Sequence, residues 1–295
     1  MERTVENDLL KVTVADAGAE LVSVYDKTRG VERIWSADPA VWGRHAPVLF
    51  PFEGKLIGGK YTYKGTEYAM TSHGFARDRD FEFVSADDKS ITHVLKSDDK
   101  TLAIYPFHFE LYITHTLEKD TITVQWKIVN TDSNEEMLYG IGAHPGFTFP
   151  AGQKATDCSM RFFSDDKDTA CPKLTYYYLD ASGCADTSQA FELGLSDGVT
   201  PITEGMFDKD ALVVMDSQIA GAQILDKDGQ VYVSMSCPDF PYFGIWSKGD
   251  TPFLCLEPWH AVTDIAGHDG KLENKRGMNR LAPGASHEYS YTMTF

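Results

Sequence analysis

The chain has 295 residues, of which 42% are hydrophobic and 24% charged, a composition typical of globular proteins and unlike disordered or fibrous ones. Asp and Glu outnumber Lys and Arg by 44 to 27, and the net charge of −17 argues against nucleic acid and anionic membrane surfaces as partners. A small anionic substrate is still compatible with this charge, because a few local cations can make a pocket positive inside an acidic protein.

The beginning of the chain, MERTVEND, has no basic stretch followed by an apolar one, so we do not expect a signal peptide. No apolar run approaches the ~20 residues that span a bilayer. The five cysteines are odd in number and widely spaced, which argues against a disulfide framework or a thiolate zinc site. We therefore expect free thiols and a cytoplasmic protein.

Strict alternation of apolar and polar residues dominates the chain and predicts half-buried β-strands. A short hairpin is expected across Lys64 and Gly65, and a longer one across the polar turn at residues 118–121. Helical periodicity is scarce, and only Asp186–Leu195 is expected to hold a short helix. The stretch from Pro150 to about Asp186 is irregular and reads as an excursion from the sheets. The pattern predicts one all-β domain over residues 1–295, an antiparallel sandwich or barrel.

Two early segments interrupt the alternation. The run from Ala46 to Leu56 is apolar but contains two prolines and a glycine, which favours an ordered loop with Lys55 at its exposed tip. In the segment SHGFARD, His73 and Arg77 can place an imidazole and a guanidinium at one cavity edge. The alternative interpretation is a surface ion pair of Arg77 with Asp78 or Asp80.

Three later segments carry candidate acid–base and ligand-binding groups. In GAHPGF, glycines and a proline surround His144, which is a plausible general acid or base or else a structural histidine in a turn. In LEPW, Glu257 ends an apolar strand, where burial would perturb its pKa, and Trp259 can form an apolar wall or a platform for a sugar face. Asp210 opens a strand and can accept hydrogen bonds from ligand hydroxyls, although a turn aspartate is the commoner meaning.

Nucleotide-binding, nucleophile-elbow and zinc-protease motifs are absent from the sequence, which leaves acid–base chemistry or binding alone. A metal site built from His73, His144 and Glu257 is conceivable, but nothing in their spacing demands a metal.

These segments resemble the aldose 1-epimerase (mutarotase) family, in particular its LacX-like branch. The likeness covers essentially the whole chain, and the motifs occur in the family's order: PVLFPFEGKL, SHGFARD, GAHPGF, FDKDALVV, DFPYFGIWS, CLEPWHAVTD and GMNRLAPGASHEYSYTMTF. The resemblance implies a large antiparallel β-sandwich of the galactose mutarotase type with few short helices. It also implies an isomerase that interconverts α and β anomers without a cofactor.

Carried over motif by motif, the resemblance makes Glu257 the base that removes the proton from the anomeric hydroxyl and His144 the acid that protonates the ring oxygen. It makes His73 a second histidine that hydrogen-bonds the substrate, and Asp210 a substrate-binding aspartate. Lys55 is a departure, because the family commonly has arginine there and lysine lacks the bidentate fork. Arg77 can supply the missing contact, or a phosphate contact if the substrate is a sugar phosphate.

The expected partner is thus a small-molecule sugar or sugar phosphate, and the sequence leaves the sugar and the oligomeric state open. The competing hypothesis is a carbohydrate-binding protein on the same fold without useful turnover. A glycan-cleaving enzyme would require a second carboxylate across the glycosidic bond from Glu257.

Overall fold

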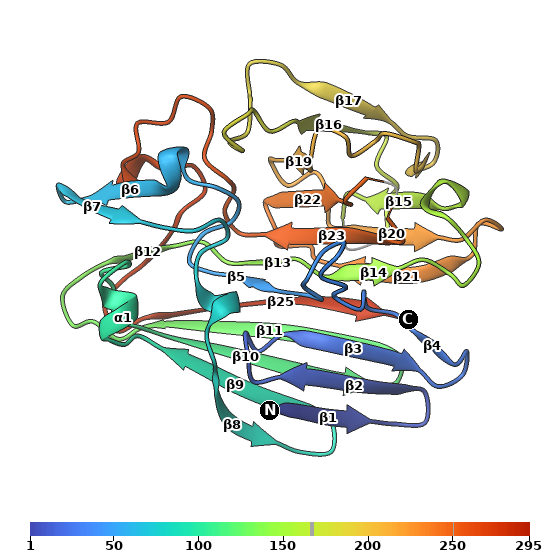
Figure 1. The fold of residues 1–295 in the computed structure, drawn as a ribbon, viewed down its shortest axis with the longest axis horizontal. Helices are drawn as coiled ribbons and strands as arrows, with labels where there is room; N and C mark the ends of the chain where they lie inside the picture. Colours follow the sequence, from blue (N-terminus) through green and yellow to red (C-terminus); the bar gives the residue numbers. More distant parts are fainter. Residues whose placement is uncertain (166–167, 250) are drawn as a thin grey trace.

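The computed structural model describes residues 1–165, 168–249 and 251–295, and its regular secondary structure consists mainly of antiparallel strands (Figure 1). One sheet has nine strands, in the order β18 (Val199–Pro201), β15 (Ser159–Phe163), β20 (Gly221–Leu225), β21 (Val231–Ser236), β25 (Ser286–Thr294), β11 (Thr121–Asn130), β10 (Phe109–Glu118), β9 (Ser90–Lys96) and β8 (Glu82–Ala86). A second sheet contains β17 (Phe191–Gly194), β16 (Lys173–Tyr177), β19 (Leu212–Val214), β22 (Tyr242–Trp246), β23 (Phe253–Trp259), β13 (Gly142–Ala143) and β5 (Val48–Leu49), and β14 (Gly146–Thr148) also pairs with β23. The two sheets share one large apolar core that runs from Val5 to Met293.

Smaller elements complete the fold. A four-stranded sheet contains β1 (Glu2–Glu6), β2 (Leu10–Ala15), β3 (Leu21–Asp26) and β4 (Val31–Glu32), and two-stranded ribbons pair β6 (Lys60–Tyr63) with β7 (Thr66–Ala69) and β12 (Met137–Tyr139) with β24 (Asn279–Leu281). The helices are α1 (Asp99–Leu102) and the 3-10 turns η1 (Ile57–Gly59), η2 (Ala76–Asp78), η3 (Ala155–Asp157) and η4 (Leu272–Asn274). In the described part of the chain, none of these helices has the length and apolar character needed to cross a membrane.

The predicted antiparallel, mostly-β fold is confirmed, and so are both hairpins. Strands β10 and β11 pair over their whole length, from Phe109 opposite Asn130 to Glu118 opposite Thr121. Strands β6 and β7 pair around Lys64 and Gly65. Both predictions hold because alternation with a polar turn specifies a hairpin locally, with no help from distant residues.

The short helix predicted over Asp186–Leu195 is wrong. The end of this stretch is strand β17, which pairs with β16, and the ring of Phe191 stacks on Tyr176 with centroids 5.7 Å apart. The alternation of Phe191, Glu192 and Leu193 fits a strand at a sheet edge better than a helix. The predicted excursion between Pro150 and Asp186 also contributes β15 and β16 to the two large sheets, while residues 166–167 lie outside the described residues.

Strand β23 is buried along both faces, and this arrangement positions the functional site. Leu254 and Leu256 point into the core between the large sheets. The alternate residues Phe253, Cys255 and Trp259 face the other way and belong to separate apolar clusters on the outer side of this sheet. Because side chains alternate along a strand, Glu257 also projects outward, under the loops that cover this face.

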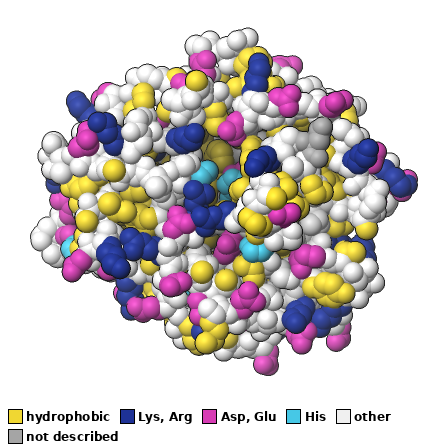
Figure 2. All heavy atoms as spheres, in the orientation of Figure 1, with side chains coloured by type: hydrophobic (Ala, Val, Ile, Leu, Met, Phe, Trp, Pro, Cys, Tyr) yellow, Lys and Arg dark blue, Asp and Glu magenta, His cyan; other side chains and the backbone are white. Residues whose placement is uncertain are grey.

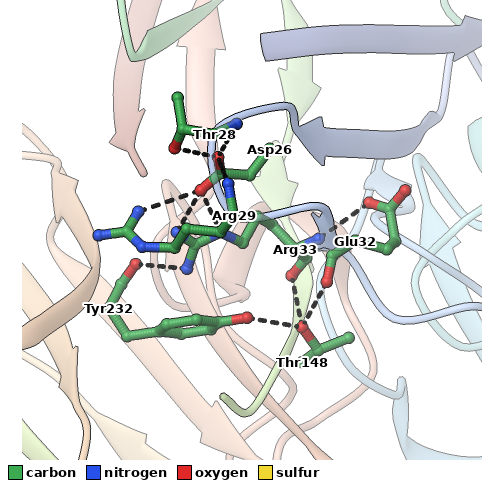
Figure 3. Close-up of polar contacts among 7 residues, drawn as sticks. All are labelled: Asp26, Thr28, Arg29, Glu32, Arg33, Thr148 and Tyr232. Carbon is green, nitrogen blue, oxygen red and sulfur yellow. Dashed lines mark hydrogen bonds and ion pairs between the residues drawn. The ribbon is translucent and has the colours of Figure 1, made fainter. Parts of the chain in front are cut away.

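A buried polar network fastens the four-stranded sheet to the rest of the molecule (Figure 3). Arg33 is completely buried, and its guanidinium bonds Asp26 at 2.7 Å and the carbonyl oxygen of Tyr232 on β21 at 3.1 Å. The hydroxyl of Thr148 on β14 donates to the carbonyl oxygen of Glu32 at 2.9 Å. Since β14 comes directly after the loop that carries His144, this network ties the site to the N-terminal sheet.

Candidate active site

A cavity of about 330 Å³ lies on the outer side of β23, a volume near the lower end of the ~300–1,000 Å³ typical of small-molecule sites. Figure 2 shows histidine side chains inside the hollow at the centre of this face, with Lys and Arg side chains around it. The structure brings all seven residues that the sequence singled out to the wall of this one cavity: Lys55, His73, Arg77, His144, Asp210, Glu257 and Trp259.

Glu257 and His144 form a close pair at the floor of the cavity. The Nε2 atom of His144 lies 3.4 Å from Oε2 of Glu257, and the two residues are only 7% and 1% exposed. Within the described residues, Oε2 of Glu257 and Nδ1 of His144 have no hydrogen-bond partner. Buried polar atoms without partners cost stability, so their retention here points to a ligand that supplies the missing contacts.

Burial shifts both groups of this pair toward their neutral forms. It raises the pKa of Glu257 well above the ordinary value, and the negative charge of Asp210 adds to that effect while the nearby Trp259 indole opposes it. Burial and the positive charge of Arg77 lower the pKa of His144 to about 3. Each neutral form avoids the cost of an isolated charge in a dry cavity.

Two hydrogen bonds to the backbone of Gly54 hold His73 in place. Its backbone N–H donates to the carbonyl oxygen of Gly54 at 2.7 Å, and the N–H of Gly54 donates to Nδ1 of the imidazole at 3.2 Å. Burial, with His144 and then Arg77, Lys55 and Arg44, lowers the pKa of His73 well below its ordinary value. A neutral ring whose Nδ1 accepts a hydrogen bond carries its proton on Nε2, which makes that nitrogen a donor.

Backbone conformations that most residues avoid position two of the site residues. His73 has φ +67° and Asp210 has φ +72°, both in the left-handed region, where strain is common at functional sites. Gly74 follows His73 with φ +71°, and a Cβ atom there would lie 2.2 Å from the carbonyl oxygen of Phe50. Only glycine therefore allows the histidine loop to sit this close to the loop that carries Lys55.

Thr263 and the buried ion pair of Asp264 with Lys275 hold the backbone of the Lys55 loop. The N–H of Lys55 donates to the hydroxyl of Thr263 at 3.0 Å, and the N–H of Asp264 donates to the carbonyl oxygen of Lys55 at 3.0 Å. Asp264 in turn bonds the ammonium of Lys275 at 2.9 Å, and both side chains are 2% exposed. The backbone of the loop is thus fixed, while the side chain of Lys55 reaches the cavity from an exposed position, as predicted.

Among the described residues, Arg77 forms neither of the surface pairs, with Asp78 or with Asp80, that were the alternative interpretation. Asp78 pairs with Arg44 at 2.6 Å, while the guanidinium of Arg77 donates to the carbonyl oxygen of Ser72 at 2.7 Å. Arg77 lies on η2 at the cavity wall, and its Nε atom is buried without a partner among the described residues.

Aromatic side chains pack around His144, and two of them, Trp42 and Trp246, were not predicted from the sequence as site residues. The ring of Trp42 stacks on His144 with centroids 4.9 Å apart, and Trp246 meets the same imidazole edge-on at 5.6 Å. Both line the cavity together with Trp259, Thr263 and Lys248. Trp42 lies in an irregular segment between Pro39 and Gly43. No strand pattern requires a tryptophan there, and this feature of the sequence could have indicated a role in the site.

The site also contains a set of potential metal ligands. His144, Cys255 and Glu257 each offer a ligand atom, and these atoms lie within 4.8 Å of one another. Among the described residues, Cys255 thus replaces His73 in the triad considered from the sequence. Burial raises the pKa of the Cys255 thiol well above its ordinary value, so metal binding there would have to remove a tightly held proton.

Comparisons with known proteins agree with this architecture. The family model described as Aldose 1-epimerase matches residues 2–192. The chain is 27% identical over 297 residues to the plasmid-encoded protein LacX of Lactococcus lactis subsp. lactis, covering 98% of this chain and 97% of LacX. A galactose mutarotase related enzyme from Lactobacillus acidophilus matches with a TM-score of 0.92 and 33% identity, covering 100% of this chain and 97% of that one. A galactose mutarotase-like protein from Lactobacillus casei ATCC 334 matches with a TM-score of 0.90 and 28% identity, covering 100% and 99%.

Proposed function

The chain belongs to the aldose 1-epimerase family, and from that premise we propose that it interconverts the α and β anomers of a monosaccharide. The observation that carries the proposal is the buried pair of Glu257 and His144, 3.4 Å apart on the floor of a cavity of monosaccharide size. Anomer exchange needs one group that takes a proton and one that gives a proton, and a carboxyl group beside an imidazole supplies both.

In the proposed reaction, Glu257 takes the proton of the anomeric hydroxyl and His144 gives a proton to the ring oxygen. The C1–O5 bond breaks as the C1 carbonyl forms, rotation about C1–C2 presents the other face, and closure returns both protons. The neutral resting pair reaches the carboxylate–imidazolium form by moving its proton from Glu257 to His144. Sugar hydroxyls that hydrogen-bond the carboxylate offset the cost of this charge separation, because they supply the polar partners that the empty cavity lacks.

The remaining cavity residues have proposed roles in binding. The Nε2–H of His73 donates a hydrogen bond to the sugar, and the carboxylate of Asp210 accepts from its hydroxyls. Trp259 presents an apolar face to the sugar ring, and Lys55 and Arg77 bind sugar oxygens.

The proposal is tested by magnetisation-transfer NMR, which measures exchange between the anomers of glucose, of galactose and of their 6-phosphates with and without the protein. We expect exchange above the spontaneous rate for at least one of these sugars. Glu257→Gln keeps the size and the hydrogen-bonding capacity of the side chain but cannot accept the proton, so we expect kcat to fall by about 10²–10⁴-fold.

His108→Asn is the matched control for His144→Asn, because His108 is exposed and does not line the cavity. Only the His144 variant should lose activity. The carbohydrate-binding alternative would be favoured if wild-type protein changed no exchange rate while added sugar still shifted the protein's resonances. Full activity of Glu257→Gln would show that another residue is the base.

A further inference from the structure

The cavity departs from the strongly acidic character of the protein. The whole chain carries a net charge of −17, yet three cations, Lys55, Arg77 and Lys248, line the cavity against the two carboxyl groups of Asp210 and Glu257. Even with both carboxyl groups ionised, the three cations outnumber them among the described lining residues. The wall is therefore net positive inside an acidic surface.

Two of these cations are fixed on the same side, next to His73. Lys55 follows Gly54, whose carbonyl oxygen and N–H both bond His73. The guanidinium of Arg77 bonds the carbonyl oxygen of Ser72, the residue before His73, at 2.7 Å. Both charges also lower the pKa of His73, which agrees with their placement around it.

Neither cation has an acidic partner in the described part of the chain. The neighbouring Arg44 is the one that neutralises Asp78, and it also donates to the carbonyl oxygen of Arg77 at 3.2 Å. The Nε–H of Arg77 is buried and has no acceptor among the described residues. A guanidinium held this way is ready to make charge-assisted hydrogen bonds to an anionic oxygen. The third cation, Lys248, differs in that its ammonium already bonds the carbonyl oxygen of Val41.

We propose that the sugar bound in this cavity carries an anionic group, phosphate or carboxylate, which rests against Arg77 and Lys55 while the anomeric carbon faces Glu257 and His144. This inference rests on the proposed function, since it names the substrate class of the same site. Asp210, an acidic lining residue near Glu257, repels the anionic group and so favours the orientation that places this group against the two cations.

The test compares kcat/KM for anomer exchange of galactose, galactose 6-phosphate and galacturonate, measured with the whole chain by magnetisation-transfer NMR. We expect at least one anionic sugar to exceed neutral galactose by about ten-fold or more, because each charge-assisted hydrogen bond favours it. Preference for the phosphate or for the carboxylate identifies which anion the site accepts. The advantage should shrink as NaCl rises from 0.05 to 0.5 M, while the rate on neutral galactose stays constant.

Arg77→Gln should reduce the ratio of anionic to neutral kcat/KM by about ten-fold, mainly through KM. Arg79→Gln is the matched control, since Arg79 lies in the same segment but does not line the cavity, and it should leave the ratio unchanged. If Arg77→Gln fails to fold, Lys55→Met replaces it in the test, because Lys55 is exposed. We expect Lys55→Met to reduce the same ratio of anionic to neutral kcat/KM.

Equal or faster exchange of neutral galactose, with no effect of Arg77→Gln on the ratio, would overturn this inference and leave the epimerase proposal standing. Absence of exchange for all three sugars would overturn both.

Discussion

At the scale of single residues, burial rather than intrinsic chemistry sets the proton states of the site. In the proposed reaction the pair of Glu257 and His144 carries one proton, so kcat should fall when the pair gains a second proton or loses its only one. Burial lowers the pKa of His144 to about 3 and raises that of Glu257 well above its ordinary value. The acidic and the basic limb of the pH–kcat profile should therefore lie far apart.

We therefore expect a kcat plateau that extends from about pH 5 through neutrality, measured by NMR exchange after subtraction of the spontaneous rate. Acidification through pH 6.5 should leave kcat unchanged, since a buried His144 does not take up a proton there. A decline centred near 6.5 would show instead that His144 titrates like an exposed imidazole.

A second buried carboxyl group, Glu53, makes stability depend on pH. It is completely buried, with Oε1 accepting the N–H of Ala261 at 3.0 Å, and burial raises its pKa to about 7. The folded state thus holds this proton more tightly than the unfolded chain does. The contribution is fully favourable below pH 4.5 and is lost as the pH rises through 7, at a cost of up to about 3 kcal/mol.

Glu53→Gln keeps an acceptor for Ala261 and removes the ionisation. We expect the free energy of unfolding of the variant, relative to wild type, to increase between pH 5 and pH 8 in urea titrations. Glu288→Gln, at an exposed position, should show the same difference at both pH values. A Glu53→Gln effect that does not change with pH would mean that Glu53 does not titrate in this range.

At the scale of elements, the Arg33 network is the joint that we expect to matter most for stability (Figure 3). Arg33→Met keeps an unbranched apolar stem but leaves the buried carboxylate of Asp26 with the exposed Arg29 as its remaining cationic partner among the described residues. Breaking a buried pair from one side costs about 3–5 kcal/mol, so thermal unfolding should shift to markedly lower temperature.

Lys96→Met is the matched control, because it breaks an exposed pair with Glu82 at 3.4 Å, and we expect a loss of about 0–1 kcal/mol. Anomer exchange by the folded fraction of Arg33→Met, measured well below its melting temperature, should persist, since Arg33 does not line the cavity. Equal stability losses for both variants would show that the Arg33 network contributes no more to stability than an exposed ion pair.

Elements were predictable where the pattern is local. The long hairpin of β10 and β11 follows from alternation on both sides of a polar turn. Strand β17 was mistaken for a helix because four residues at a sheet edge give too short a pattern for a choice between periods. Strand β15 lies in a segment rich in polar residues and owes its place to β20 and β18, which are distant in the sequence.

At the scale of the whole molecule, the excess of 17 negative charges destabilises the compact state through repulsion. Salt shortens the screening length from about 10 Å at 0.1 M to about 3 Å at 1 M, which weakens that repulsion. We expect the melting temperature at pH 7.5 to rise between 0.05 and 0.5 M NaCl, as measured by calorimetry. The rise should vanish near the isoelectric point of about 4.8, and a fall with salt at pH 7.5 would show that attractive ion pairs outweigh the repulsion.

The sequence by itself determined the fold class and the candidate site residues of this protein. Alternation is a property of neighbouring residues, and segments that break it without structural need, such as those of His144 and Glu257, are visible without coordinates. The tertiary structure decided which groups meet. Residues 73, 144 and 257 share one cavity because the fold brings distant segments together, and Trp42 reaches the same cavity from an irregular segment outside the strands. Burial shifts the pKa values of the pair, and packing leaves Arg77 without a carboxylate partner among the described residues. Both effects arise from the packing of the whole chain and cannot be read from any single segment.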